Sequence, residues 1–359
     1  RSGVDSSVHP LAETRPRHPG GHNPVFAYIV KRVLSGMVVM VLVSLSVFAL
    51  FWYGPSDPAR PICNNQTNNR CSPERLARFE ENLGYNNPMI VEYGKWAKGI
   101  VTGREVQFGQ LKLECPAPCL GLSFRTNQPV YEEMKQRLPA TISVALGGAL
   151  LYVVFGIPIG IAAARRRGTV GDKALVSSFL FISSIPYYLF ALLLSLYLTV
   201  IYQVPIFGDT GYHPLTENPW KWFTGLFLAW IALGIFGSTS YTRYSRGSMV
   251  EALNEDYIRT AKAKGLPPRT VVYRHALRAA LVPVVTIFGL DLGALLAGTI
   301  FTERIFDIQG IGWWGLAAVG AKDLSVVSAT TLFGAAVIIA SNIFVDVIYG
   351  VLDPRVRIS

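Results

Sequence analysis

Charged residues are scarce in this sequence, and the common short motifs of catalysis are missing from it. Only 16% of its 359 residues are Asp, Glu, Lys or Arg, whereas 51% are hydrophobic. A soluble domain usually carries about a quarter charged residues. There is no G-x-x-x-x-G-K-[ST] loop for phosphates, no H-E-x-x-H and no G-x-S-x-G. This composition excludes a disordered chain and an ordinary soluble enzyme, and we expect no catalytic site in the chain itself.

What the sequence does contain is a set of long apolar runs. A helix needs about 20 apolar residues to cross a bilayer core of about 30 Å. Six runs have this length: 33–53, 138–164, 174–202, 222–242, 279–302 and 324–345. The first follows a polar leader and has no small-residue cleavage site, so we interpret it as a span and not as a signal peptide. The predicted fold class is all-α, a polytopic membrane bundle of six transmembrane helices.

The distribution of basic residues predicts the orientation of these spans. Segments 1–32, 165–173, 243–278 and 346–359 carry 19 of the 33 Lys and Arg residues but only 7 acids, Asp346 being counted with the last span. Cytoplasmic loops are the ones enriched in Lys and Arg. We therefore expect both termini in the cytoplasm. The net charge of +10 is explained by topology and does not favour nucleic-acid binding.

The segments between the spans suggest a simple domain plan. We expect a disordered cytoplasmic leader at 1–27, a first transmembrane helix at 28–53 and an extracytoplasmic segment at 54–137. A core of five helices follows at 138–350, with a cytoplasmic loop at 243–278, and a tail ends the chain at 351–359. Helical spacing of Leu76, Phe79 and Leu83 predicts that the extracytoplasmic segment forms a small helical insertion.

The extracytoplasmic segment holds all four cysteines of the chain. Cysteines confined to the oxidising side of a membrane favour disulfides. Of the three ways to pair them, we prefer the neighbour pairing Cys63–Cys71 and Cys115–Cys119. A soft-metal site formed by Cys115 and Cys119 is the alternative, although no His lies near them.

A short helix is predicted in the cytoplasmic loop. Asn254 is a suitable N-cap, acids follow it, and Lys262 and Lys264 occupy the negative end of the helix dipole. Gly265 can adopt a left-handed conformation at the end, before two prolines. A helix of about ten residues is marginal alone in water, so something should pack against it. A connector on the membrane surface and a docking element for a cytoplasmic protein both fit these residues.

Two carboxylates lie within or at the end of the spans. Asp291 is near the middle of the fifth run, where an acid is costly and often lines a polar path. A hydrogen-bonded contact between helices is the alternative. Asp346 lies at the inner end of the sixth run, where we expect an Arg partner or a backbone contact. Pro158 and Pro186 should bend the second and third spans.

Further motifs follow one another in a recognisable order. They are GPSDP at 54–58, LPAT at 138–141, GIPIG at 156–160, SIP at 184–186, DYIRTAKAKG at 256–265, HALR at 275–278, LVP at 281–283, Glu303 and LDPR at 352–355. In these motifs, which extend over residues 28 to 357, the chain resembles the transmembrane permease subunits of bacterial ATP-binding-cassette importers. The similarity is to the dipeptide/oligopeptide/nickel branch and its B-type subunits.

The sequence departs from that family at two places on the outer face. Segments 61–72 and 112–120 form a cysteine-bearing insertion, and Gln309 replaces the usual Pro before Gly310. Within the family's cytoplasmic E-A-A-x-x-x-G pattern, Arg259 stands at the first position, which is common in this branch. These outer differences bear on how a receptor docks and not on coupling.

The resemblance implies the fold of a type I importer permease in a bacterial plasma membrane. It also implies a second, homologous permease subunit, two ATPase subunits that bind ATP and Mg, and an extracytoplasmic substrate-binding protein, with no cofactor in this chain. The residues implied in ATPase coupling are Asp256, Tyr257, Arg259, Thr260, Ala261, Ala263 and Gly265. Those expected along the translocation path are Asp291, Ser184 and Pro186.

The transported solute is not determined by the residues. The resemblance implies di- or oligopeptides, and nickel, haem or another small solute is the alternative for a permease of this type. A secondary transporter driven by an ion gradient is a further alternative. It would favour several intramembrane charges and an internal repeat, whereas this sequence has one central acid and no convincing repeat.

Overall fold

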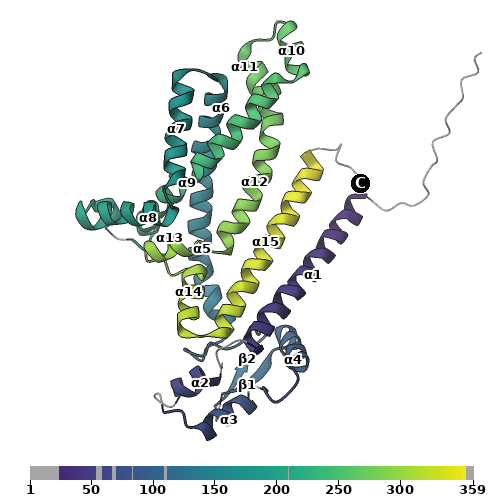
Figure 1. Ribbon diagram of the computed structural model, residues 1–359, viewed down its shortest axis with the longest axis vertical. Helices are drawn as coiled ribbons and strands as arrows, with labels where there is room; N and C mark the ends of the chain where they lie inside the picture. The colour runs from purple at the N-terminus through teal and green to yellow at the C-terminus, as the bar shows by residue number, and fades with distance from the viewer. Residues whose placement is uncertain are drawn as a thin grey trace, which may run out of the picture.

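The computed structural model describes residues 24–53, 59–66, 70–82, 84–108, 111–208 and 210–352. The protein is a long helical molecule with a small domain at one end and a short helix at the other (Figure 1). The predictions for the GPSDP motif at 54–58 and for most of the leader and tail lie outside the described residues. Residues 24–27 of the predicted leader are helical and belong to the first span.

The membrane part of the chain consists of long helices joined by short ones. In chain order the elements are α1 (Pro24–Tyr53), α5 (Val130–Leu151), η1 (Tyr152–Gly156), α6 (Ile157–Arg165), α7 (Val170–Ser184), α8 (Tyr187–Ser195), η2 (Leu196–Ile201), η3 (Pro205–Phe207), α9 (Pro219–Asn254), α10 (Asp256–Ala263), α11 (Pro268–Thr270), η4 (Val271–Ala276), α12 (Leu277–Ala297), α13 (Ile300–Ile305), α14 (Ile311–Ala321) and α15 (Leu324–Leu352). Within the described residues, five helices are long and apolar enough to cross a membrane, or up to six if a bent pair counts as one span.

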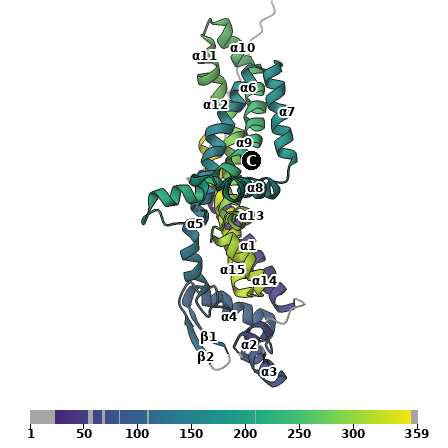
Figure 2. The same ribbon diagram turned by 90° about the vertical axis from the view of Figure 1, so that its left-hand side faces the viewer.

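That bent pair is the third predicted span. The run 174–202 is not one continuous helix, because α7 and α8 meet at an angle of 89°. Ile185 has the extended conformation (φ −81°, ψ 130°) that is favoured before a proline, so the helix ends there and restarts after Pro186. The proline was expected to bend the span, but the break is much sharper than a kink. Figure 2 shows α8 lying across the long axis of the molecule.

The second span passes Pro158 with a milder adjustment. Five π-helical residues, Tyr152–Gly156, lie just before this proline, and the span continues as α6. A π segment of this kind accommodates the missing backbone donor without breaking the helix.

Helix α9 packs closely along this second span. A Cβ added at Gly156 would lie 2.5 Å from Cβ of Tyr241, and one at Gly160 would lie 2.6 Å from the carbonyl oxygen of Thr242. Gly147 and Gly148 meet the α9 side chains Trp230 and Leu233 in the same way. The small residues therefore permit close packing of the two helices.

Helix α1 lies at the edge of the bundle against α15 (Figure 1). Gly36 faces Ile339 and Ile343 across this contact. Nearer the start of α1, Nε of Arg32 lies 2.9 Å from Oδ2 of Asp346. Asp346 thus has the Arg partner that its position suggested, although the pair is partly exposed.

The described residues between 59 and 129, called the outer domain here after their predicted side of the membrane, are not purely helical. They contain α2 (Ala59–Gln66), α3 (Pro73–Asn82) and α4 (Met89–Thr102), and then an antiparallel hairpin of β1 (Arg104–Phe108) and β2 (Leu111–Cys115), in which Arg104 pairs with Cys115. The expectation of a helical insertion was therefore wrong for residues 104–108 and 111–115. The alternation of Leu111, Leu113 and Cys115 with polar residues was the signal for a strand.

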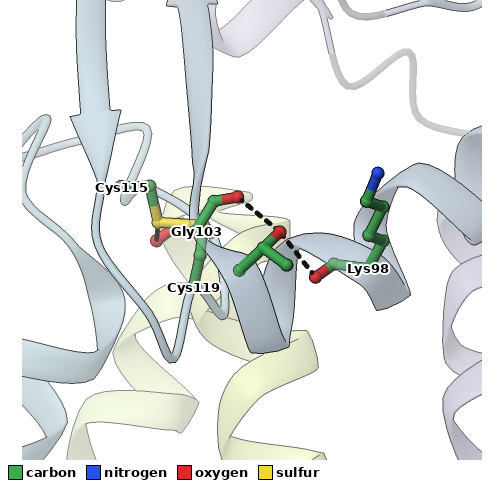
Figure 3. The surroundings of a disulfide bond; sticks show 6 residues. Lys98, Gly103, Cys115 and Cys119 are labelled. Carbon is green, nitrogen blue, oxygen red and sulfur yellow. Dashed lines mark hydrogen bonds between the residues drawn. A yellow bond between two sulfur atoms is a disulfide. The ribbon is translucent and has the colours of Figure 1, made fainter.

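Two disulfides hold this outer domain together. They join Cys63 to Cys71 and Cys115 to Cys119, which is the neighbour pairing preferred from the sequence, and they leave no cysteine thiols for a metal. Figure 3 shows the second disulfide beside the end of α4. There Gly103 has a φ of 72°, and a Cβ on it would lie 2.9 Å from the carbonyl oxygen of Cys115. Only glycine fits this contact.

Two buried carboxylates, Asp323 and Glu303, accept hydrogen bonds that join the outer domain to the start of α15 and join α13 to α5 and α14. Asp323 precedes α15, is almost fully buried, and accepts a hydrogen bond of 2.5 Å from the Ser123 hydroxyl. Glu303 on α13 is fully buried and accepts bonds from the Thr141 hydroxyl (2.8 Å) and the Trp313 amide (2.7 Å). Burial raises the pKa of Glu303, and these hydrogen bonds oppose that shift.

Candidate functional site

Helix α10 packs on an apolar base at the end of the bundle opposite the disulfide-bearing domain (Figure 1). Ile258 is fully buried and Ala261 is 7% exposed. They pack in one cluster with Ile161, Ala164, Met249, Ala252, Val271, Val272, Ala276 and Ala280. Burying a side chain such as that of Ile258 contributes about 1.5–3 kcal/mol, so this contact supplies the partner that a helix of eight residues needs.

Both ends of α10 are sharply defined. Glu255, and not Asn254 as predicted, is the N-cap, since Asn254 is the last residue of α9. At the other end Gly265 has a φ of 74°. The Gly265 amide donates to the Lys262 carbonyl (3.0 Å) and the Leu266 amide to the Ala261 carbonyl (3.3 Å). These two bonds make a Schellman motif, which fixes where the helix ends.

The other face of α10 is exposed. Asp256, Tyr257, Arg259, Thr260, Ala263 and Gly265 are all on the surface. Arg259 pairs with Asp256 at 3.6 Å. Both side chains are well exposed, so this pair stabilises the helix little. Of the residues implied in coupling, only Ala261 faces inward. Of these seven residues, the structure therefore places Ala261 in the apolar base and the other six on the surface.

An ion pair fixes the neighbouring helix α7 close to the same end. Nε and Nη2 of Arg246 on α9 each lie 2.7 Å from an oxygen of Asp172. Asp172 also accepts a bond from the Gly168 amide, and Thr169 caps the helix by accepting from the Asp172 amide. The Asp172 side chain is 2% exposed. This bidentate pair joins α7 to α9 about two turns before α9 ends.

The second group of candidate residues lies in the centre of the bundle. Asp291 on α12 is half-buried and accepts a hydrogen bond of 2.8 Å from the hydroxyl of Tyr241 on α9. The ring of Tyr241 is buried and lies 5.3 Å from that of Tyr152. Asp291 therefore makes a contact between helices, which was the alternative to lining a path. Its partial exposure also leaves it accessible from one side.

Ser184 and Pro186 lie at the sharp bend between α7 and α8, and both are exposed. The Ser184 hydroxyl donates to the Phe181 carbonyl of its own helix (2.7 Å), and the contacts with other helices are made by the neighbouring residues. The Ser183 hydroxyl lies 3.0 Å from that of Thr239, and the Tyr187 hydroxyl lies 2.6 Å from that of Thr302. Thr239 and Tyr241 are two residues apart on α9, so the bend and Asp291 both contact the same turn of that helix.

The sequence pointed to the acids and prolines of this site but not to their partners. Asp172, Tyr241 and Arg246 were not singled out, although each makes a bond that joins two helices. The available signals were weak. Asp172 is the only acid in the strongly basic loop 165–173, and Tyr241 begins the polar end of an otherwise apolar run.

Comparison with known proteins places the chain in a family. Residues 156–358 match the family described as "binding-protein-dependent transport system inner membrane component", and residues 25–145 match its N-terminal region. A putative peptide transport system permease protein of Brucella abortus is 34% identical, over 92% of this chain and 99% of its own length.

Two further relatives have similar coverage. The dipeptide transport system permease protein of Escherichia coli K12 is 32% identical over 92% of this chain and 98% of its own. A probable peptide ABC transporter permease protein of Sinorhizobium fredii is 30% identical over 92% and 99%. With a family match over more than half of its length, and with helices that can cross a membrane several times, this chain belongs to the inner-membrane components of binding-protein-dependent transport systems.

Proposed function

We propose that the chain is the membrane-spanning subunit of an ATP-driven importer of di- and oligopeptides. The relatives over nearly the whole chain are named as peptide or dipeptide transport permeases. The single structural observation that carries the proposal is α10, an exposed, firmly capped helix held on a buried base. The exposed patch on α10 is the surface on which an ATPase subunit would dock.

The assembly has four kinds of component in this proposal. A second, homologous permease subunit completes the passage, two cytoplasmic ATPase subunits bind ATP and Mg, and a substrate-binding protein docks outside. The termini lie in the cytoplasm of a bacterial cell. The basic loops and the position of both disulfides in the outer domain support this orientation, because disulfides persist on the oxidising side.

Coupling would proceed through rigid contacts. ATP binding closes the two ATPases and draws the α10 helices of the permeases together, and hydrolysis resets them. Displacement of α10 is passed to α9 because Ile258 and Ala261 pack against Met249 and Ala252. Because the Asp172–Arg246 ion pair joins α7 to α9, a displacement of α9 would also move α7 and, with it, the bend at Ser184 and Pro186.

The passage for the solute would lie beside the centre of the bundle. Asp291, the Tyr241 hydroxyl and the exposed bend offer polar groups at membrane depth in an otherwise apolar environment. A carboxylate at this depth suits the amino groups and backbone amides of a peptide. The broken third span supports this placement, since discontinuous helices often surround transport sites.

Site-directed crosslinking tests the docking surface directly. Ala263→Cys, on the exposed face of α10, is expected to crosslink to an ATPase subunit in intact cells. Ala261→Cys is the matched control, two residues away but turned toward the apolar base. No capture at Ala263, or equal capture at both positions, contradicts the proposed docking face.

Uptake measurements test the solute. Cells with and without this gene are given labelled dipeptides, longer peptides, nickel and haem in parallel. We expect gene-dependent, ATP-dependent uptake of peptides only. Gene-dependent uptake of nickel or haem without peptide uptake assigns the permease to one of the alternative solutes, and uptake that follows an ion gradient without ATP contradicts the importer.

A further inference from the structure

A cavity lies where the outer domain meets the two spans α1 and α15. Its volume is about 430 Å³, within the range of small-molecule sites. It is lined by Ser44, Val47, Phe48 and Trp52 of α1, by Ser325, Ser328 and Leu332 of α15, and by residues of α3, α4, β1 and the neighbouring loops, whose charged members are Glu81, Glu92, Lys95, Arg104 and Glu105. Nothing in the proposed transport cycle uses this cavity.

Much of the cavity lies at membrane depth. The α15 residues that line it extend from Ser325 to Leu332, which corresponds to about 10 Å along a helix axis. Both α1 and α15 are long enough and apolar enough to cross the bilayer. Because the outer domain covers one end, this part of the cavity is at the level of the outer leaflet.

Aromatic side chains lie between the part of the cavity at membrane depth and its polar part beside the outer domain. The ring of Phe48 lies 5.7 Å from that of Trp52 and 5.9 Å from that of Trp96. The hydroxyls of Ser44 and Tyr93 lie 2.7 Å apart and join α1 to α4. Tryptophan and tyrosine gather at the membrane–water boundary, so the mouth of the cavity is placed at the level of lipid headgroups.

The side chain of Arg104 lines the polar part of the cavity, beside the outer domain. Arg104 begins β1, and its aliphatic stem lies over Gly99 of α4, where an added Cβ would be 2.8 Å from its Cδ. Its Nε is buried and has no hydrogen-bond partner among the described residues. Burial lowers the pKa of this guanidinium, and the nearby charge of Glu92 opposes the shift. This donor lacks the acceptor that a buried guanidinium requires.

The nearest acid does not supply that acceptor. Oε1 of Glu92 already accepts bonds from Lys95 (2.5 Å) and from the Asn87 amide (2.8 Å). The cavity therefore combines an apolar part at membrane depth with a partly buried cation at its polar end. An amphiphile with an anionic head matches both parts.

We propose that this cavity binds a phospholipid of the outer leaflet, with the phosphate at Arg104 and one acyl chain between α1 and α15. The planar guanidinium is well suited to phosphate oxygens. The chain would lie against Val47, Phe48 and Leu332. This inference does not depend on which solute the permease transports.

Photo-crosslinking tests the proposal on the purified full-length protein. The probe is phosphatidylglycerol with a diazirine in one acyl chain, added to the protein in micelles of an uncharged sugar detergent, which contains no phosphate. Diacylglycerol with the same diazirine chain is the matched neutral probe. We expect phosphatidylglycerol to label peptides containing residues 44–52 or 325–332, and at least five times more strongly than diacylglycerol does.

Variants test the two ends of the cavity separately. Arg104→Gln is expected to reduce labelling at least fivefold, while Arg78→Gln, an exposed outer-domain arginine that does not line the cavity, changes it less than twofold. Ser328→Trp fills the acyl part and should reduce labelling similarly with Arg104 intact. Unchanged labelling in either cavity variant overturns the proposal. So does equal labelling by diacylglycerol, or full competition by water-soluble glycerol phosphate, which would indicate a soluble anion.

Discussion

Gly265 offers the sharpest test of how α10 works, because the structure separates its backbone role from its surface role. Its φ of 74° is left-handed, so any other residue there costs about 1 kcal/mol, or roughly a fivefold change in the population of the capped end. A Cβ added at Gly265 would meet nothing within 4 Å. Gly265→Ala and Gly265→Trp therefore carry the same backbone cost and should both insert normally.

The difference between these two variants reports on docking. If the exposed end of α10 enters a groove of the ATPase, tryptophan adds bulk at that contact and alanine does not. In proteoliposomes containing the complete importer, we expect peptide uptake to fall at most about fivefold for Gly265→Ala, in line with the backbone cost. We expect at least a further tenfold loss for Gly265→Trp, with ATP hydrolysis continuing. Uptake and hydrolysis are measured in the same vesicles.

Two results would refute this reasoning. Normal uptake by Gly265→Trp contradicts a docking role for this end of the helix. Equal, large losses in both variants would show that the left-handed cap matters and the surface does not. Gly265→Asn is a useful third variant, since asparagine tolerates the left-handed region better than alanine and should lie closest to the wild type.

Three further predictions concern contacts that join elements. Tyr241→Phe removes the donor to Asp291 and should destabilise the protein by about 1–3 kcal/mol, seen as a lower melting temperature in detergent; an unchanged melting temperature argues against this bond. Arg246→Gln leaves the buried Asp172 unpaired and should cost about 2–3 kcal/mol, less than for a fully buried pair because Arg246 is partly exposed, and the charge swap of both residues should recover part of the loss. Cys63→Ser opens a short disulfide loop and should cost the outer domain about 2–3 kcal/mol, which protease sensitivity of that domain detects; unaltered cleavage is the contrary result.

The apolar runs carried most of the information about the fold. Crossing a bilayer imposes a length and a composition that few other structures share, so the spans could be located from sequence alone. The presence of disulfides was also predictable, because all four cysteines lie in one segment, whereas the neighbour pairing was a preference among three possibilities. The β-hairpin was missed because Arg104, Glu105 and Lys112 obscure a short alternation, and its strands have only five residues each.

The sequence indicated which kinds of residue belong to the candidate site, but it did not indicate which side chains contact one another. Asp291 attracts attention because an acid is costly within a membrane span, and Pro186 because proline bends or ends a helix. Their consequences depend on tertiary structure. The angle of the bend and the Tyr241–Asp291 bond both depend on how α9 lies against its neighbours, and the inward position of Ala261 depends on the base beneath α10. A local pattern does not contain that information.

The length of α9 has a mechanical consequence. The helix continues 12 residues beyond the apolar run that ends at Thr242, which is about 18 Å of rod outside the hydrocarbon region. A soluble ATPase can therefore reach the tip without touching lipid. The same rod is a lever: a tilt of roughly 10° about Tyr241 would sweep its tip by about 3–4 Å. In the proposed coupling, a push of a few ångströms at the tip therefore becomes a tilt of α9 at the polar centre of the bundle.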